Sequence, residues 1–214
     1  MKNLYNSRFE TISAWKENEY YNKAESPSFL SFFWDSGTPF RFLFDKLDAT
    51  DIVELACGRG RHVSIYQSLS STITLVDPNE ENIAFCKDRF SKKNFTGKIK
   101  YIINSGNELY AIEDESKTAL FCYDAMVHFE LLDTYMYLRE IYRILKPGGR
   151  ALLHHSNAAF NPSCSYSEKP HWRNFMSAEI ITHLASRANL TVSQQVIIPW
   201  GVIANLDCLT LLQK

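Results

Sequence analysis

The sequence predicts an α/β fold with a doubly wound, mostly parallel, seven-stranded sheet and helices on both faces. Short apolar runs alternate with helix-like stretches from Asp51 onward, and most of the apolar runs stop at polar or glycine-containing turns. The length of 214 residues suits a single domain. We therefore expect one domain, 1–214, made of an aromatic helical leader or lid (1–49) and an α/β core (50–214).

The leader is unusually rich in aromatic side chains. Its residues Phe40, Leu43, Phe44 and Leu47 recur at helical spacing, which predicts helices that cover the sheet. Tyr20, Tyr21 and Trp34 are candidates for a pocket beneath such a lid, while core packing is the ordinary role for most of these aromatic residues.

The first four strands are expected at residues 51–55, 71–76, 100–103 and 118–123. Between the second and third strands, a helix is expected from about residue 79. The spacing of Ile83, Cys86 and Phe90 is i, i+3 and i+7, so these three residues should form its buried face.

A strong helix is predicted over residues 131–145, closed by Lys-Pro-Gly-Gly at 146–149. A fifth strand begins at residues 150–153 and continues into His-His-Ser-Asn at 154–157. Ser177 is typical of a helix N-cap, with the helix running to about residue 188. Two further strands are expected at 191–198 and 206–212. In such sheets, ligands bind beyond the carboxyl ends of the strands.

The turn after the first strand has the form Glu54-x-x-x-Gly58-x-Gly60. Glycines allow a tight turn and a close approach of backbone to a ligand, and the following helix offers its N-terminus. A glycine pair alone equally fits a plain turn. Asp77 ends the second strand at 77 − 58 = 19 residues after Gly58, and an acidic residue at about 20 residues can bind ribose hydroxyls. A helix N-cap just before Pro78 is the alternative role for Asp77.

A nicotinamide cofactor would use the same architecture with a G-x-G-x-x-G turn. Here Gly60 is followed by Arg61-His62-Val63, which supplies no third small residue. The carboxylate of Glu54 also suits a cationic sulfonium cofactor and its ammonium group better than a pyrophosphate.

These pieces resemble the class I S-adenosylmethionine-dependent methyltransferases, which have a Rossmann-like fold. The matching segments are Glu54–Gly60, Thr74–Asp77, Ser105–Asn107 and Leu145–Gly149, in the order found in the family. The resemblance implies S-adenosyl-L-methionine as cofactor and S-adenosyl-L-homocysteine as product. It implies that Glu54 and the glycine loop hold the methionine part, Asp77 the ribose and Asn107 the adenine amino group. The full cofactor-binding set that we expect is Glu54, Ala56, Gly58, Gly60, Asp77, Pro78, Gly106, Asn107, Tyr123 and Asp124.

Three histidines are candidates for catalysis. Methyl transfer to an alcohol needs alignment and removal of a proton, which histidine can accept near neutral pH. His128 follows the fourth strand, and His154 and His155 end the fifth. Because successive strand residues point to opposite faces, at most one of His154 and His155 should face the substrate. A hydrogen-bonded structural histidine is the alternative for each.

The segment at 169–176 can cover a pocket. His171 and Arg173 in it could bind an anionic group, and a surface loop anchored by Trp172 is the alternative. The candidate substrate-binding set is Asn157, His171, Arg173, Tyr21 and Trp34. The His-His-Ser-Asn and His-Trp-Arg-Asn pieces also resemble a branch of methyltransferases linked to bacterial surface-polysaccharide pathways, which implies a sugar, nucleotide-sugar or phosphorylated precursor as substrate.

The sequence thus predicts O-methylation of a small, anionic or sugar-like metabolite. An NAD-dependent oxidoreductase and a non-catalytic methyltransferase-fold partner subunit are the alternatives. Lys and Arg (23) balance Asp and Glu (24), so nucleic acid is not expected as a partner. Five scattered cysteines without a CxxC pair predict no metal site. No apolar stretch is long enough to span a bilayer, so we expect a cytoplasmic protein with no membrane partner.

Overall fold

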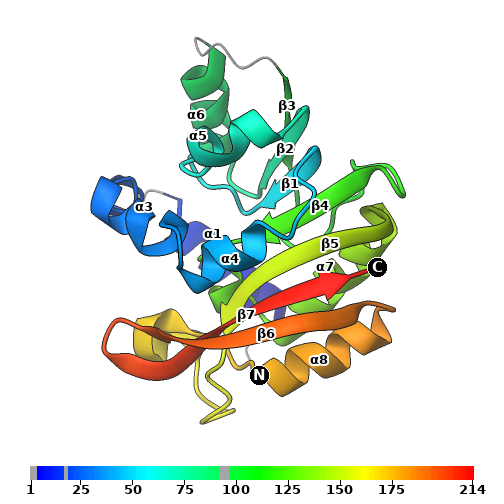
Figure 1. The fold of residues 1–214 in the computed structure, drawn as a ribbon. Coiled ribbons are helices and arrows are strands. Elements are labelled where there is room, and N and C mark those ends of the chain that lie inside the picture. Colours follow the sequence, from blue (N-terminus) through cyan, green and yellow to red (C-terminus); the bar gives the residue numbers. More distant parts are fainter. Residues whose placement is uncertain (1–3, 17–18, 92–96) are drawn as a thin grey trace.

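The structure, a computed structural model, describes residues 4–16, 19–91 and 97–214. Its sheet has seven strands in the order β3-β2-β1-β4-β5-β7-β6 (Figure 1). β7 runs antiparallel to its neighbours β5 and β6, and the other pairs are parallel. The predicted mostly parallel, seven-stranded sheet is confirmed. The strands are β1 (Asp51–Leu55), β2 (Thr72–Asp77), β3 (Lys98–Ile103), β4 (Lys117–Cys122), β5 (Leu145–Ser156), β6 (Thr191–Trp200) and β7 (Ile203–Gln213).

Helices cover both faces of the sheet. One hydrophobic cluster joins α3, α4, α5 and α6 to one face, and a second joins α7 and α8 to the other. The α-helices are α1 (Leu4–Ala14), α2 (Tyr20–Ala24), α3 (Pro27–Trp34), α4 (Pro39–Phe44), α5 (Val63–Tyr66), α6 (Glu80–Ser91), α7 (Leu131–Ile144) and α8 (Ala178–Arg187). Short 3-10 turns lie at η1 (Gln67–Leu69), η2 (Met126–His128), η3 (Tyr166–Glu168) and η4 (Pro170–Trp172).

The leader forms helices because its sequence caps them. Ser26 and Thr38 are the N-caps of α3 and α4: each side chain accepts a hydrogen bond from a backbone N–H three residues later, and a proline stands at the first position of each helix. The aromatic side chains of these helices enter the core beside the sheet. Trp34 is one of them, and its indole donates to His62 Nδ1 at 3.0 Å.

The segment after α7 differs from the prediction. The helix ends at Ile144, as the Lys-Pro-Gly-Gly signal indicates. The four residues of that signal, 146–149, are themselves part of β5, which already begins at Leu145. Lys117 pairs with Leu145, and the register then shifts so that Ala119 pairs with Arg150. Backbone bonds between residues 148–149 and Lys214 hold the irregular stretch in place. The stop signal therefore ends the helix without ending regular structure.

The predicted buried face of α6 is confirmed, with Ile83, Cys86 and Phe90 all buried. Ser177 caps α8 through its side chain, which accepts from the Ile180 N–H at 3.2 Å. In the described ranges, no helix combines the length and the apolar character needed to cross a membrane.

Candidate functional site

A cavity opens at the carboxyl ends of β1, β2 and β4, where the strand order reverses direction from the centre of the sheet. The turn after β1 and the ends of β2 and β3 form one part of its wall. The segment after β4 forms another, and leader side chains close it from above. The lining residues include Arg8, Ile12, Trp15, Tyr20, Tyr21, Gly58, Arg61, Asp77, Gly106, Asp124 and His128.

The glycine loop needs glycine for two separate reasons. Gly58 and Gly60 have φ of +52° and +71°, a region that disfavours side chains. A Cβ on Gly58 would lie 2.8 Å from Tyr21 Cε1, and one on Gly60 would lie 2.8 Å from Phe90 Cε2. The helix that follows, α5, has only four residues. Gly58 therefore presents its backbone to the cavity, whereas Gly60 faces α6 and does not line the cavity.

Asp77 lines the cavity and also organises the loop. Its Oδ2 accepts the Gly58 N–H at 2.8 Å, and its Oδ1 accepts the Asn79 N–H at 2.9 Å and Asn82 Nδ2 at 3.1 Å. Burial raises the pKa of Asp77, while these donors act to lower it. A carboxylate offers about four acceptor directions. Three are occupied here, and one is left for a hydroxyl in the cavity.

Glu54 does not lie among the cavity-lining residues. Its side chain is buried, and Oε2 accepts the Tyr66 hydroxyl at 2.7 Å. Burial raises the pKa of Glu54 to about 8, so the carboxyl is mostly protonated at pH 7. The Glu54 carboxyl is thus neutral and bonded to Tyr66 of α5. This arrangement does not favour the role expected for Glu54, which was to bind a cofactor ammonium group.

The turn after β3 contributes Gly106, whose Cα faces the leader. A Cβ there would lie 2.8 Å from Ile12 Cδ1. Asn107 lies outside the cavity-lining set, and its Nδ2 donates to Asp133 Oδ1 at 3.3 Å. Asp133 also forms an ion pair with Arg8 of α1. The contacts of Asn107 therefore do not support adenine recognition by its side chain.

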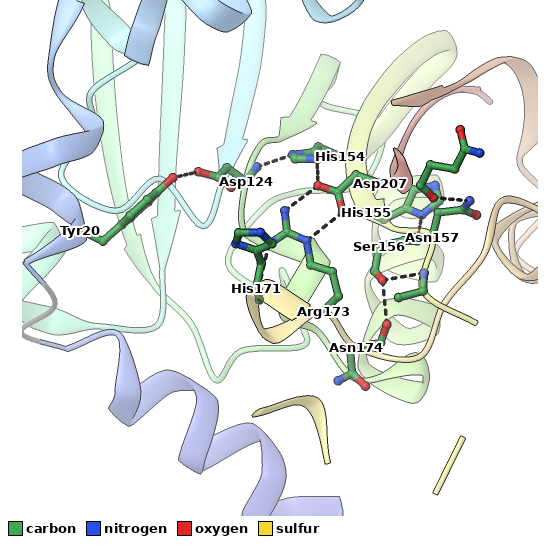
Figure 2. Close-up of polar contacts among 12 residues, drawn as sticks. Tyr20, Asp124, His154, His155, Ser156, Asn157, His171, Arg173, Asn174 and Asp207 are labelled. Atoms are coloured by element: carbon green, nitrogen blue, oxygen red, sulfur yellow. Dashed lines mark hydrogen bonds and ion pairs between the residues drawn. The ribbon is translucent and has the colours of Figure 1, made fainter. Parts of the chain in front are cut away.

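The end of β4 brings Asp124 into the cavity in a left-handed backbone conformation, with φ of +56°. Its N–H donates to His154 Nδ1 at 3.1 Å. Its Oδ2 receives the Tyr20 hydroxyl, as Figure 2 shows, and lies 2.9 Å from Arg61 Nη2. Asp124 raises the pKa of Arg61, against the effect of burial. The positive charge of Arg61 is thus already paired.

The three candidate histidines have different environments. His128 lines the cavity, and its Nδ1 lies 2.7 Å from the Trp172 carbonyl oxygen. His154 is fully buried outside the cavity-lining set. Its Nδ1 accepts the Asp124 N–H, and its Nε2 lies 3.0 Å from Asp207 Oδ2.

His155 is also fully buried away from the cavity. Its Nδ1 lies 2.8 Å from the Ser156 carbonyl oxygen, and its Nε2 lies 2.8 Å from Thr210 Oγ1. Both ring nitrogens of His154 and of His155 are therefore engaged within the protein. Of the three histidines, the cavity contains only His128 among its described lining residues.

Arg173 is buried and held by a carboxylate. Its Nε and Nη2 donate to the two oxygens of Asp207 at 2.8 and 2.5 Å (Figure 2). Asn157 accepts the Ala178 N–H at 3.1 Å and donates to the Asn205 carbonyl at 3.0 Å. Of the candidate substrate-binding set, Tyr21 lines the cavity, whereas Asn157, His171, Arg173 and Trp34 do not.

Several cavity residues were not predicted from the sequence. Arg61 directly follows Gly60, so its position beside the loop gave a usable signal. Trp15 was recognised only as part of an aromatic leader, whereas Tyr20 was a candidate pocket residue, like Tyr21 and Trp34, and does line the cavity. Asp207, which lies behind the cavity wall, had no signal beyond its place in the predicted strand at 206–212, because its partners Arg173 and His154 are distant in sequence.

The comparisons with known proteins show what the central part of the chain resembles. Residues 53–153 match the model of a family described as the methyltransferase domain. The central part of the chain, just under half of its length, is thus similar to methyltransferase domains. The matched residues include the glycine loop, Asp77 and the end of β4, and exclude the leader and the segment from His154 onward. A search of curated proteins found no match.

Solved structures share the fold of this chain at low identity. A SAM-dependent methyltransferase from Leishmania major has a TM-score of 0.69 at 12% identity, covering 99% of this chain and 87% of that one. One from Mesorhizobium loti has a TM-score of 0.66 at 13% identity, covering 84% and 99%. A chain of the complex between the Haloferax volcanii Trm112 methyltransferase activator and its methyltransferase partner has a TM-score of 0.68 at 15% identity, covering 94% and 96%.

Proposed function

We propose that this protein binds S-adenosylmethionine and transfers its methyl group to a hydroxyl of a small, neutral, sugar-like metabolite. The observation that carries this proposal is a single cavity that joins the glycine loop and Asp77 to the end of β4. A methyl donor held by the first part would have its acceptor at the second. The family match supports the same cofactor.

The charges of the cavity wall favour a cationic cofactor. Its described lining residues include five carboxylates (Glu25, Asp77, Asp124, Glu130, Asp133) and three guanidinium groups (Arg8, Arg59, Arg61). The difference, 3 − 5 = −2, suits a sulfonium with an ammonium group. It opposes the two phosphate charges of NAD, so the oxidoreductase alternative is the weaker one.

The chain's own residues divide the binding between them. Asp77 has one acceptor direction left for a ribose hydroxyl, and the backbone around Gly58 and Gly106 offers close approach where side chains would not fit. When bound, the cofactor supplies an electrophilic methyl group. Leader residues 1–49 act in this proposal as a lid of the same domain, because Tyr21 and Ile12 lie over these glycines.

The acceptor side favours a neutral molecule over an anionic one. Of the arginines in the cavity wall, Arg8 and Arg61 already have carboxylate partners, and Arg173 behind the wall is paired as well. The wall near His128 is aromatic: the Trp15 ring lies 4.9 Å from the His128 ring and 5.6 Å from that of Tyr20. Aromatic faces pack against the C–H faces of a sugar ring, and polar edges orient its hydroxyls.

Replacing Asp77 by Ala tests the cofactor site. The affinity for S-adenosylhomocysteine, measured by isothermal titration calorimetry, should fall by about 1–3 kcal/mol because a hydrogen bond to a buried group is lost. Asp88→Ala, a carboxylate on the exposed side of α6, should leave the affinity unchanged. Equal affinities for both variants would remove the ribose role of Asp77. Binding of NAD without binding of S-adenosylhomocysteine would favour the oxidoreductase.

A screen with labelled S-adenosylmethionine tests the acceptor class. Neutral sugars and their glycosides should accept label, and the matching sugar phosphates should accept less. The reverse order would contradict the proposed neutral acceptor. A second candidate function comes from the Haloferax volcanii neighbour, which was solved with an activator protein. A non-catalytic partner subunit would bind the cofactor and label no acceptor.

A further inference from the structure

We propose that His128 is the base that removes the acceptor's proton, and that Asp207 and Arg173 are positioning residues that hold the segment fixing its tautomer. This inference rests on the proposed function. It also gives the His-Trp-Arg-Asn segment, which the sequence suggested for substrate binding, a different role.

His128 offers a nitrogen lone pair to the cavity. The 2.7 Å contact with the Trp172 carbonyl requires a proton on Nδ1, because a carbonyl oxygen only accepts. Nε2 of the neutral ring is then an acceptor, and it has no hydrogen bond to any described residue. Burial lowers the pKa of His128 to about 4, so the ring is neutral across the physiological range and its Nε2 lone pair is not blocked by a proton.

Trp15 places a hydrogen-bond donor beside this acceptor. Its indole ring contacts the His128 ring, and the buried indole Nε1 has no partner among the described residues. Both side chains line the cavity. A hydroxyl can satisfy both groups, since its oxygen accepts from the indole while its proton is donated to the imidazole.

The Trp172 carbonyl reaches His128 through a strained turn. His171 and Trp172 have φ of +51° and +56°, a conformation that costs non-glycine residues free energy and needs support from the surroundings. Arg173 supplies that support: its Nη1 donates to the His171 carbonyl at 3.0 Å, while its other nitrogens are fixed by Asp207.

The next residue ties the same segment to the end of β4. The Asn174 N–H donates to the Val127 carbonyl at 2.8 Å, and its Nδ2 donates to the His128 carbonyl at 3.3 Å. Ser156 Oγ donates to the Asn174 carbonyl at 2.8 Å, which Figure 2 shows. Backbone and side chain of His128 are therefore both held by the segment at 171–174.

Asp207 also acts on the other side of the cavity wall. The carboxylate that fixes Arg173 receives the Nε2 proton of His154, and this leaves His154 Nδ1 as the acceptor for the Asp124 N–H. Asp124 is another residue with a positive φ. Its carboxylate accepts hydrogen bonds from the Tyr20 hydroxyl and from Arg61 Nη2. One buried carboxylate thus bonds both His154, which contacts Asp124, and Arg173, which contacts the turn beside His128 (Figure 2 shows Asp207 with His154 and Arg173).

The chemical step balances with these groups. The acceptor oxygen bonds to the methyl carbon of the sulfonium cofactor, the carbon–sulfur bond breaks with its electron pair going to sulfur, and the hydroxyl proton goes to His128 Nε2. Asp207 and Arg173 touch no reacting atom. Their effect on the rate would come through the tautomer and position of His128.

Imidazole nitrogen NMR on the full-length protein tests the tautomer without any turnover. We expect His128 with its proton on Nδ1 and His154 with its proton on Nε2, whereas the exposed His183 should show the usual mixture of tautomers. Arg173→Met should shift His128 toward a mixture, Arg173→Lys should retain more of the fixed form, and Arg187→Met on the surface of α8 should change nothing. A proton on Nε2 of wild-type His128 would overturn the proposal.

Kinetics with an accepted sugar supply the second test. His128→Gln should lower kcat by about 100-fold or more, the usual contribution of a general base, and leave S-adenosylhomocysteine affinity within about twofold. Full turnover in His128→Gln would overturn the proposal even if the tautomer is as expected. Failure of the wild-type protein to bind S-adenosylhomocysteine would instead contradict the proposed function, and the NMR result would still stand on its own.

Discussion

At the scale of single residues, Glu54 shows how burial changes the chemistry that a motif suggests. Its position before the glycine loop is the one that the family resemblance uses, yet its carboxyl is enclosed and bonded to Tyr66. Asp77 is just as buried but accepts three hydrogen bonds from N–H groups. Glu54 accepts one hydroxyl donor away from the cavity, whereas Asp77 accepts three N–H donors and lines the cavity, so equal burial does not give the two carboxyl groups the same chemistry.

Glu54→Gln should stabilise the protein at alkaline pH. The folded carboxyl keeps its proton up to about pH 8, whereas the unfolded one loses it near 4.5. Wild-type stability from this group is therefore full below pH 4.5 and declines as pH rises to 8, by at most about 1.4 kcal/mol per pH unit. Glutamine cannot ionise and still accepts from Tyr66. Urea unfolding at pH 5 and pH 8 measures the free energy of unfolding of the wild type and of Glu54→Gln. The two proteins should differ more at pH 8, and a constant difference would contradict the raised pKa.

Sequence reasoning reached the spacing of these residues but not their directions. The distance from Gly58 to Asp77 follows from one strand–helix–strand unit, so it can be counted along the chain. Whether Glu54 faces the cavity or α5 depends on the pleat of β1 and on Tyr66 twelve residues later. The pairing of Arg173 with Asp207 joins residues 34 positions apart, and no local pattern predicts such a contact.

At the scale of elements, the leader lies directly on the glycine loop and on the turn after β3. Tyr21 packs against Gly58 and Ile12 against Gly106, and the Asn79 Nδ2 donates to the Ile12 carbonyl at 3.4 Å. Capping motifs and aromatic spacing predicted helices over the sheet. They did not predict which aromatic residues face the cavity, because Trp34 and Tyr21 have similar local sequence character but different neighbours.

Gly58→Ala should destabilise the protein more than Gly37→Ala does. Both glycines have positive φ, which costs alanine about 1–2 kcal/mol, but only the Gly58 position adds a contact with Tyr21, since nothing lies within 4 Å of a Cβ at Gly37. In a Tyr21→Ala background, the excess cost at Gly58 should shrink. Chemical unfolding of the four variants measures this coupling. An unchanged excess would show that Tyr21 does not pack on the loop.

At the scale of the whole molecule, buried neutral histidines, one in η2 after β4 and one near the end of β5, make the fold sensitive to acid. Burial lowers the pKa of His128 and of His155 to about 4. Unfolded histidines take up a proton near pH 6.5, so the stability that these two residues contribute is present above 6.5 and is lost as pH falls toward 4. The Asp207 carboxylate, whose pKa is lowered to about 2 by Arg173 and His154 against burial, stays charged throughout this range.

His155→Gln should therefore flatten the acid limb of the stability curve. The variant keeps groups able to bond the Ser156 carbonyl and Thr210, and it removes one of the protons that buried histidines take up on unfolding. The free energy of unfolding should fall less steeply between pH 6.5 and 4, by up to about 1.4 kcal/mol per pH unit. Denaturant titrations across that range supply the measurement, and parallel curves for the two proteins would contradict a depressed pKa at His155.

The position of β7 between β5 and β6 determines when the sheet can be completed during synthesis. Asp207 lies on this strand, which the ribosome synthesises after every other strand of the sheet. A nascent chain that has completed the glycine loop and β4 still lacks the carboxylate that orients His154 and Arg173. The glycine loop and Asp77 can therefore come together during translation, whereas the network around His154 and Arg173 has to wait for β7 to pair between β5 and β6.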